Sequence, residues 1–205
     1  MTSRALVAVD LQYDFCPGGA LAVPDGDSVI PVVNALSSRF DLVVATQDWH
    51  PANHGSFASN HPGATAGEAV VLGGVPETLW PDHCVQGTPG ARLHDGFDLG
   101  PVAAIVRKGT DPSVDSYSAF FDNARRRTTG LAGYLREWDV AEVWFAGLAT
   151  DYCVKYSVLD ALELGFGAVV VADACRGIDL EAGDVVRALA QMAAAGARMV
   201  EGGPS

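Results

Sequence analysis

The chain has 205 residues, 49% of them hydrophobic, which is typical of a globular protein with one substantial core and excludes a disordered chain. Its formal net charge of −12 would repel phosphate backbones, so nucleic acid is not expected as a partner. No apolar run reaches the roughly 20 residues that a membrane span needs, so no membrane association is expected.

The first ten residues, MTSRALVAVD, predict a strand and lack the long apolar core and the cleavage site of a signal peptide. This favours a cytoplasmic location. The four cysteines are scattered along the chain without a CxxC pair, which predicts free thiols in a reducing compartment. They are Cys16, Cys84, Cys153 and Cys175.

Five short β-rich runs predict strands that are buried on both faces. These runs span residues 5–10, 42–48, 102–108, 141–147 and 168–174. Helical patterns occupy residues 27–39, 151–164 and 179–196, and a short last strand is expected near 198–200. Gly165 and Gly196 stand where helix ends favour a left-handed residue. The run Arg125–Arg127 is interpreted as the solvated start of a helix. Alternating strands and helices predict an α/β fold, with a parallel sheet covered on both faces.

Residues 49–101 show little periodicity and are rich in Gly, Pro, His and Asn. The segment holds every histidine of the chain: His50, His54, His61, His83 and His94. An irregular segment of this length inside a compact domain usually has a function. We therefore predict a single domain over residues 1–205 that carries a metal-binding loop segment at about residues 49–101.

Reactive side chains follow four of the predicted strands. Asp10 ends the first strand, Asp48 ends the second with His50 just beyond it, and Lys108 ends the third. The fourth is followed by GLATDYC, which places Cys153 in the first turn of the next helix. One such residue would be an ordinary solvated strand end. Together they predict a site, because ligands of open parallel sheets bind beyond the carboxyl ends of the strands.

Cys153 is the predicted nucleophile, since a helix N-terminus favours a thiolate. Thr150 or Asp151 is expected to cap this helix, and the amides of the turn suit an oxyanion hole. The other three cysteines are interpreted as small buried residues.

A cysteine nucleophile needs a partner that accepts its proton and returns it to the leaving group. Asp10 is the candidate because it ends a neighbouring strand, and Lys108 could favour the thiolate. The predicted triad is Asp10, Lys108 and Cys153. The alternative is a plain Asp10–Lys108 salt bridge without a catalytic role.

Asp48 and His50 project to the same side of an extended chain, so they can bind one ion, with His83 as a third ligand. Carboxylate and imidazole ligands suit Zn²⁺, Fe²⁺ or Mn²⁺. The alternative for this pair is a satisfied polar turn.

Long blocks of the sequence resemble the nicotinamidase family within the isochorismatase-like cysteine hydrolases. The blocks are VDLQYDFCPGGALAV, TQDWHPANHGSFASNH, LWPDHCVQGTPGA, VRKGTDPSVDSYSAFFDN and GLATDYCVKYSVLDAL. The resemblance implies a three-layer α-β-α fold with a six-stranded parallel sheet. It assigns catalysis to Asp10, Lys108 and Cys153, and metal binding to Asp48, His50 and His83, with His54 as the candidate for a further ligand.

The resemblance also implies a cis peptide between Leu148 and Ala149, which would direct the amides of Ala149 and Cys153 at a substrate carbonyl oxygen. Phe15 and Trp80 match family positions that hold the substrate ring. Further candidates for the substrate pocket are Leu21, Tyr117 and Tyr152. Ordinary core packing is the alternative for these side chains.

The activity implied by the resemblance is hydrolysis of nicotinamide to nicotinate and ammonia through a cysteine thioester, with one divalent metal ion, in NAD salvage. Pyrazinamide is the expected side substrate, and a homo-oligomer is allowed. The DxH block separates this family from simpler relatives that share only the Asp, Lys and Cys pattern.

Three alternatives stand beside this reading: another amide or carbamoyl substrate, a non-catalytic ligand-binding or metal-binding protein, and a nucleotide-binding domain. The last is disfavoured because LQYDFCPGG, not GxGxxG, follows the first strand.

Overall fold

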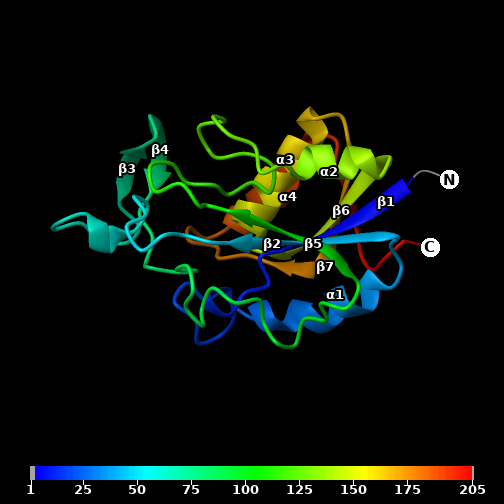
Figure 1. The fold of residues 1–205 in the computed structure, drawn as a ribbon, viewed down its shortest axis with the longest axis horizontal. Coiled ribbons are helices and arrows are strands. Elements are labelled where there is room, and N and C mark those ends of the chain that lie inside the picture. The colour runs from blue at the N-terminus through cyan, green and yellow to red at the C-terminus, as the bar shows by residue number, and fades with distance from the viewer. Residues whose placement is uncertain (1–2, 205) are drawn as a thin grey trace.

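The computed structural model describes residues 3–204 and contains a six-stranded sheet in the order β5-β2-β1-β6-β7-β8 (Figure 1). All neighbouring strands of this sheet run parallel. Its strands are β1 (Ser3–Val9), β2 (Leu42–Asp48), β5 (Val102–Lys108), β6 (Val140–Leu148), β7 (Gly167–Arg176) and β8 (Arg198–Val200). The predicted parallel α/β sheet, including its short last strand, is confirmed.

Helices cover both faces of the sheet: α1 (Ile30–Ser37) lies on one face, and α2 (Leu131–Glu137), α3 (Lys155–Glu163) and α4 (Asp184–Ala194) lie on the other (Figure 1). Successive side chains of a strand point to opposite faces, so one strand feeds both cores. Leu6 and Ala8 of β1 pack in the cluster that contains α1. Val7 and Val9 pack in the cluster that contains α2, α3 and α4.

The helices are shorter than the hydrophobic pattern predicts. Residues 27–39 divide into the 3₁₀ turn η2 (Gly26–Val29) and α1, and α4 begins only at Asp184. Gly165 and Gly196 do follow helix ends with positive φ, as predicted.

The interpretation of Arg125–Arg127 as a helix start is wrong, because these residues lie in a turn and α2 begins later. The Asp122 carboxylate accepts the backbone N–H groups of Arg126 and Arg127, which stabilises the turn instead of a helix. Asp122 and similar residues compete with helix formation by such local bonds.

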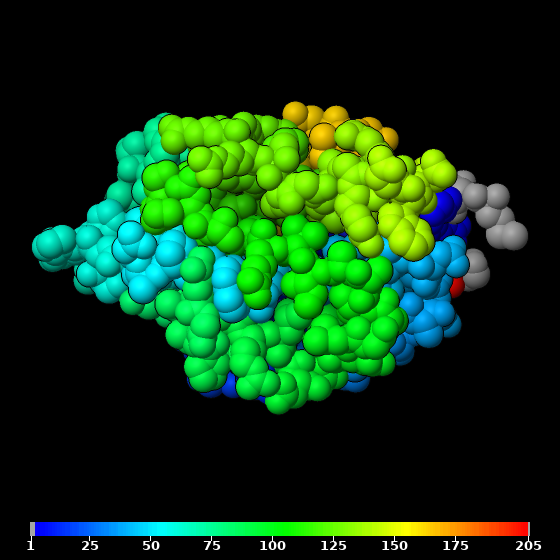
Figure 2. Space-filling view, viewed as in Figure 1, coloured from blue at the N-terminus to red at the C-terminus, as the bar shows by residue number. Residues whose placement is uncertain are grey.

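Residues 49–101 are less irregular than predicted, since they contain the short 3₁₀ turn η3 (Ala58–Asn60) and the antiparallel hairpin β3 (Ala69–Leu72) and β4 (Val75–Thr78). Gly73 and Gly74, both with positive φ, join the two strands. The hairpin lies beyond the end of the main sheet (Figure 1), and this part of the chain projects at one end of the molecule (Figure 2). Among the helices that the structure describes, none has the length and apolar character for a membrane crossing.

Candidate active site

The predicted residues meet at the carboxyl edge of the sheet. Asp10 follows β1 directly, while Asp48 and Lys108 end β2 and β5 and are register partners in the sheet. Cys153 lies in η4 (Thr150–Val154), a π-helical turn that connects β6 to α3. Chain segments far apart in sequence therefore deliver an acid, a base and a thiol to one point.

The buried ammonium group of Lys108 contacts all three acidic groups around it. Its Nζ lies 2.9 Å from Asp10 Oδ2, 2.9 Å from Asp48 Oδ1 and 3.4 Å from Cys153 Sγ. It also donates to the backbone carbonyl of Ser116 at 3.1 Å. A plain Asp10–Lys108 salt bridge does not describe this arrangement, because the same cation contacts the thiol and a second carboxylate.

Asp10 is fully buried, and its Oδ1 accepts a hydrogen bond of 2.6 Å from the hydroxyl of Thr46. Burial raises the pKa of the Asp10 carboxyl, against the opposing charge of Lys108. A carboxylate with a raised pKa is a stronger base. Sequence reasoning missed Thr46, although it precedes Asp48 by two residues on the same strand and so faces the same side.

The sulfur of Cys153 is held as a thiol. Burial raises the pKa of Cys153 well above its usual value, although Lys108 acts in the opposite direction. Desolvation outweighs the effect of Lys108, and the role of the helix N-terminus in favouring the thiolate stays a prediction. The nucleophile needs a neighbouring base to remove its proton.

The prediction that Thr150 or Asp151 caps this helix is wrong, because η4 has no side-chain cap hydrogen bond. Instead, the Asp151 carboxylate accepts the backbone N–H groups of Ile178 and Asp179, at 3.0 and 2.7 Å. Asp151 therefore fixes the loop after β7 rather than the helix that it begins.

The peptide between Leu148 and Ala149 is cis, as the family resemblance implies. The Ala149 carbonyl accepts the N–H groups of Tyr152 and Val154, each at 3.1 Å, which holds the turn around Cys153. The role of the Ala149 and Cys153 amides as an oxyanion hole stays a prediction.

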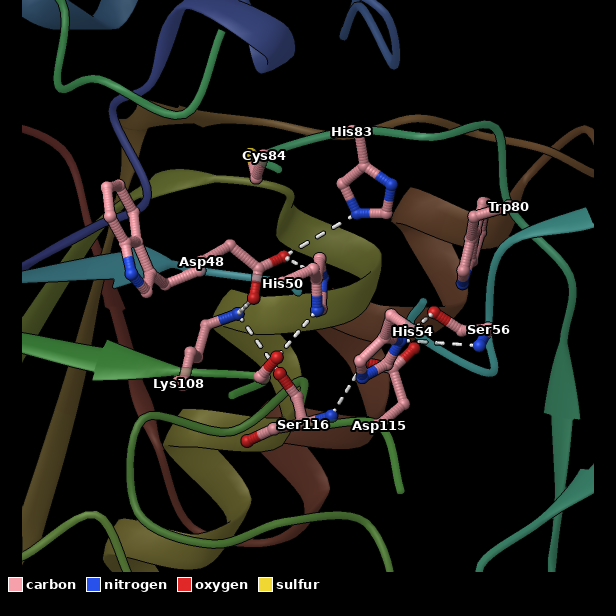
Figure 3. Close-up of polar contacts among 12 residues, drawn as sticks. Asp48, His50, His54, Ser56, Trp80, His83, Cys84, Lys108, Asp115 and Ser116 are labelled. Atoms are coloured by element: carbon pink, nitrogen blue, oxygen red, sulfur yellow. Dashed lines mark hydrogen bonds and ion pairs between the residues drawn. The ribbon is translucent and has the colours of Figure 1, made fainter. Parts of the chain in front are cut away.

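Asp48, His50 and His83 form a buried group whose potential ligand atoms all lie within 4.8 Å of one another (Figure 3). Asp48 Oδ2 lies 3.0 Å from His50 Nε2 and 3.6 Å from His83 Nε2. Two further bonds orient the rings: His50 Nδ1 pairs with the Gly109 carbonyl and His83 Nδ1 with the Pro81 carbonyl, both at 2.8 Å.

When each ring donates its outer bond from Nδ1, its Nε2 lone pair is available to an ion that the same carboxylate oxygen also faces. A carboxylate with two such imidazoles fits a divalent ion of the zinc, iron or manganese type. The sequence did not predict that Asp48 also contacts Lys108 through its other oxygen. Nor did it predict Gln12, whose amide binds both the N–H and the carbonyl of Asp48.

His54 stands beside this group rather than inside it, in a second group with His50 and Asp115. Its Nδ1 lies 2.7 Å from the Ser56 hydroxyl, and its buried Nε2 has no hydrogen-bond partner within residues 3–204. Burial lowers the pKa of His54 to about 4, which leaves the ring neutral and able to bind a cation. Its role as a further metal ligand stays a prediction.

The five side chains predicted for the substrate pocket line one small cavity next to Cys153. They are Phe15, Leu21, Trp80, Tyr117 and Tyr152. Asp115 and Ile178, which sequence reasoning missed, complete the lining together with Asp48, His83 and Ala149. Its volume is about 20 Å³.

A parallel α/β sheet that brings Cys, Asp and Lys together at its carboxyl edge defines a cysteine hydrolase. The isochorismatase domain model matches residues 4–202, and the chain belongs to this family. It is 53% identical over 203 residues to the nicotinamidase of Escherichia coli (strain K12), covering 97% of this chain and 95% of the relative.

Solved structures agree with this assignment. An Acinetobacter baumanii nicotinamidase/pyrazinamidase matches with a TM-score of 0.95 and 45% identity, over 98% of this chain and 97% of that one. A pyrazinamidase of Pyrococcus horikoshii in complex with zinc matches with a TM-score of 0.80 and 41% identity, over 97% of this chain and 99% of that one.

Proposed function

We propose that this protein is an amidohydrolase that converts nicotinamide to nicotinate and ammonia, with pyrazinamide as a side substrate. The observation that carries the proposal is the buried contact of Lys108 with Asp10, Asp48 and Cys153, next to a small aromatic pocket. High identity to a nicotinamidase over nearly the whole chain supports the choice of substrate.

In the proposed reaction, Asp10 accepts the proton of the Cys153 thiol, and the sulfur attacks the carboxamide carbon. The backbone amides of Ala149 and Cys153 stabilise the oxyanion. Asp10 then transfers its proton to the departing nitrogen, the C–N bond breaks, and ammonia and a thioester form. A water molecule loses a proton to Asp10 and attacks the thioester, and the C–S bond breaks. Asp10 returns the proton to the sulfur, which restores the thiol, and the released nicotinic acid ionises to nicotinate in solution.

Lys108 stabilises the negative charges that Asp10 and the Cys153 sulfur carry during the reaction. Its ammonium group stabilises the anionic form of Asp10 before proton transfer and of the sulfur as its proton leaves. The pKa of Lys108 stays well above its usual value, because Asp10 and Asp48 outweigh the effect of burial. It therefore acts as a fixed positive charge and not as a proton donor.

Asp48, His50 and His83 would hold one divalent ion of Zn²⁺, Fe²⁺ or Mn²⁺, with His54 as the candidate for a further ligand. When bound, this ion supplies a Lewis acid at the wall of the pocket, toward which a pyridine nitrogen would be attracted. The ring would then be fixed with its carboxamide near the sulfur, which is a positioning effect.

The proposal includes a place in NAD salvage, a cytoplasmic location and no nucleic-acid or membrane partner, and it allows a homo-oligomer. The four buried free cysteines support a reducing compartment.

The substrate is tested by chromatography of the products from a panel that contains nicotinamide, pyrazinamide, benzamide and simple carbamoyl compounds. We expect the highest kcat/KM for nicotinamide, with equimolar nicotinate and ammonia. A higher kcat/KM for a compound without a pyridine or pyrazine ring would overturn the proposed substrate while leaving the cysteine hydrolase class in place.

A further inference from the structure

The first two strands of the sheet separate before they reach the site. The register pairing of β1 with β2 ends at Ala8 and Ala45. Asp10, directly after β1, has a positive φ of 49°, so the chain leaves the strand direction there, while β2 continues to Asp48. The last residues of β2 therefore need other hydrogen-bond partners on the side that β1 has left.

Two side chains take the place of the missing strand. The Thr46 hydroxyl accepts the N–H of Asp10 at 3.1 Å. The amide of Gln12 bonds both main-chain groups of Asp48: its Oε1 accepts the N–H at 2.7 Å, and its Nε2 donates to the carbonyl at 2.8 Å. A carboxamide carries an acceptor and a donor side by side, as a peptide group does, so Gln12 continues the ladder with a side chain.

Gln12 is itself held at both ends. It is completely buried, and its Nε2 also donates to the Ala91 carbonyl at 2.9 Å. Its main chain forms an antiparallel bridge with Leu93. Two carbonyls and one N–H surround the amide, so only one orientation of its oxygen and nitrogen satisfies all three groups. The Gln12 amide therefore gives the main chain of Asp48 one defined place.

Two parts of the site depend on the residue that Gln12 holds. The Oδ1 of Asp48 contacts Lys108 at 2.9 Å, and its Oδ2 faces the imidazoles of His50 and His83 (Figure 3). Metal–ligand distances tolerate an error of only about 0.2 Å, so a small shift of the Asp48 main chain would weaken the binding of an ion. The place of this main chain is therefore a determinant of metal affinity.

We propose that Gln12 is a positioning residue, whose carboxamide sets the place of Asp48 and thereby the affinity of the site for its divalent ion. The inference rests on the proposed function for the metal group at Asp48, His50 and His83. Gln12 comes two residues after Asp10, so one short segment carries the proposed base and holds a proposed metal ligand.

The first test is Gln12→Met, which keeps an unbranched side chain of similar length and removes both hydrogen-bonding groups. The dissociation constant of Zn²⁺ is measured on chelator-treated, metal-free protein by competition with a chromophoric chelator. We expect this constant to rise roughly 10- to 100-fold, the usual effect of removing a group that orients a metal ligand. The same constant in Gln12→Met and wild type would overturn the proposal.

Gln47→Met is the matched control for a general loss of packing. Gln47 precedes Asp48 on β2, is also buried, and donates to the same Ala91 carbonyl at 2.9 Å. Its Oε1 accepts from Arg107 and not from the main chain of Asp48. We expect Gln47→Met to lower the Tm, as Gln12→Met does, and to keep the wild-type dissociation constant for Zn²⁺. An equal rise of this constant in both variants would refute a positioning role for Gln12.

A second variant, Gln12→Asn, serves if Gln12→Met does not fold. It carries the same neutral carboxamide on a side chain that is one methylene shorter, so the amide does not reach both main-chain groups of Asp48. We expect weaker Zn²⁺ binding than in wild type and in the control Gln47→Asn. Unchanged binding in Gln12→Asn would show that the place of the carboxamide does not matter, against the proposal.

Ammonia release from nicotinamide, measured on the same preparations, separates this inference from the proposed function. Weaker Zn²⁺ binding in the Gln12 variants alone, with no nicotinamide hydrolysis by wild type, supports the role of Gln12 and refutes the proposed substrate. Hydrolysis by wild type, with the same Zn²⁺ dissociation constant in Gln12→Met, refutes the role of Gln12 alone. A folded wild type that binds no divalent ion refutes both the metal group and this inference.

Discussion

At the residue scale, one side chain, that of Asp48, contacts both the catalytic residues and the predicted metal ligands. Its Oδ1 contacts Lys108, which also contacts the Cys153 sulfur, and its Oδ2 faces His50 and His83. Burial opposes its ionisation, but the charges of His50 and Lys108 hold the pKa of Asp48 well below its usual value. One permanently ionised carboxylate therefore couples the geometry of the metal group to that of the thiol.

Gly109 supports this coupling and gives a prediction. Its φ is +63°, and a Cβ atom there would lie 2.6 Å from His50 Nδ1. Gly109→Ala should therefore displace His50 and reduce the bound metal to less than half of the wild-type content by elemental analysis. Activity that remains should be lost after chelation.

Gly74→Ala is the matched control for this change. Gly74 also has a positive φ, of +86°, so an alanine there is strained in the same way, but its Cβ would meet only the Arg126 side chain, at 3.8 Å. We expect Gly74→Ala to keep its metal. Full metal content in Gly109→Ala would show that His50 does not need this glycine.

At the scale of elements, the loop between β7 and α4 is fixed to the nucleophile turn through one side chain. Asp151 of η4 is buried and accepts both N–H groups at the start of this loop. Ile178, the first of these partners, lines the substrate pocket. The loop can therefore influence substrate binding without any contact to the reacting atoms.

Asp151→Ala should remove two hydrogen bonds to part-buried N–H groups and lower the free energy of unfolding by about 1–3 kcal/mol. We expect a raised KM together with a lower Tm, since the Ile178 wall loses its anchor. Asp151→Asn keeps one acceptor, so its KM and Tm should lie between those of wild type and Asp151→Ala. Asp41→Ala, at an exposed position, should have the KM and Tm of wild type. An unchanged KM in Asp151→Ala would show that the loop does not affect substrate binding.

At the scale of the whole molecule, the sequence predicts the sheet well because buried parallel strands form continuous apolar runs. Residues 42–48 and 102–108 match the bounds of β2 and β5. The prediction of burial on both faces is correct for β2 but wrong for β5, an edge strand whose side chains alternate between half-buried and exposed. Their polar last residues, Asp48 and Lys108, also reveal the site, since parallel strands end at one edge.

The remaining features depend on contacts that a linear pattern does not contain. The short helix α2 spans only Leu131–Glu137, too few residues for a clear helical period. Gln12 and Thr46 act through partners more than 30 residues away, and their side-chain types carry no signal alone. The hairpin could have been found, because Gly73–Gly74 between two β-rich runs is a recognised turn signal.

The central claim is that Cys153 is the nucleophile of a nicotinamide-hydrolysing enzyme. The most direct test is ammonia release from nicotinamide by wild type, by Cys153→Ala and by Cys175→Ala, in which another buried cysteine is removed. We predict release by wild type and Cys175→Ala and none above background by Cys153→Ala, with all three folded and carrying the same metal. Release by Cys153→Ala at a rate comparable to wild type would contradict the account.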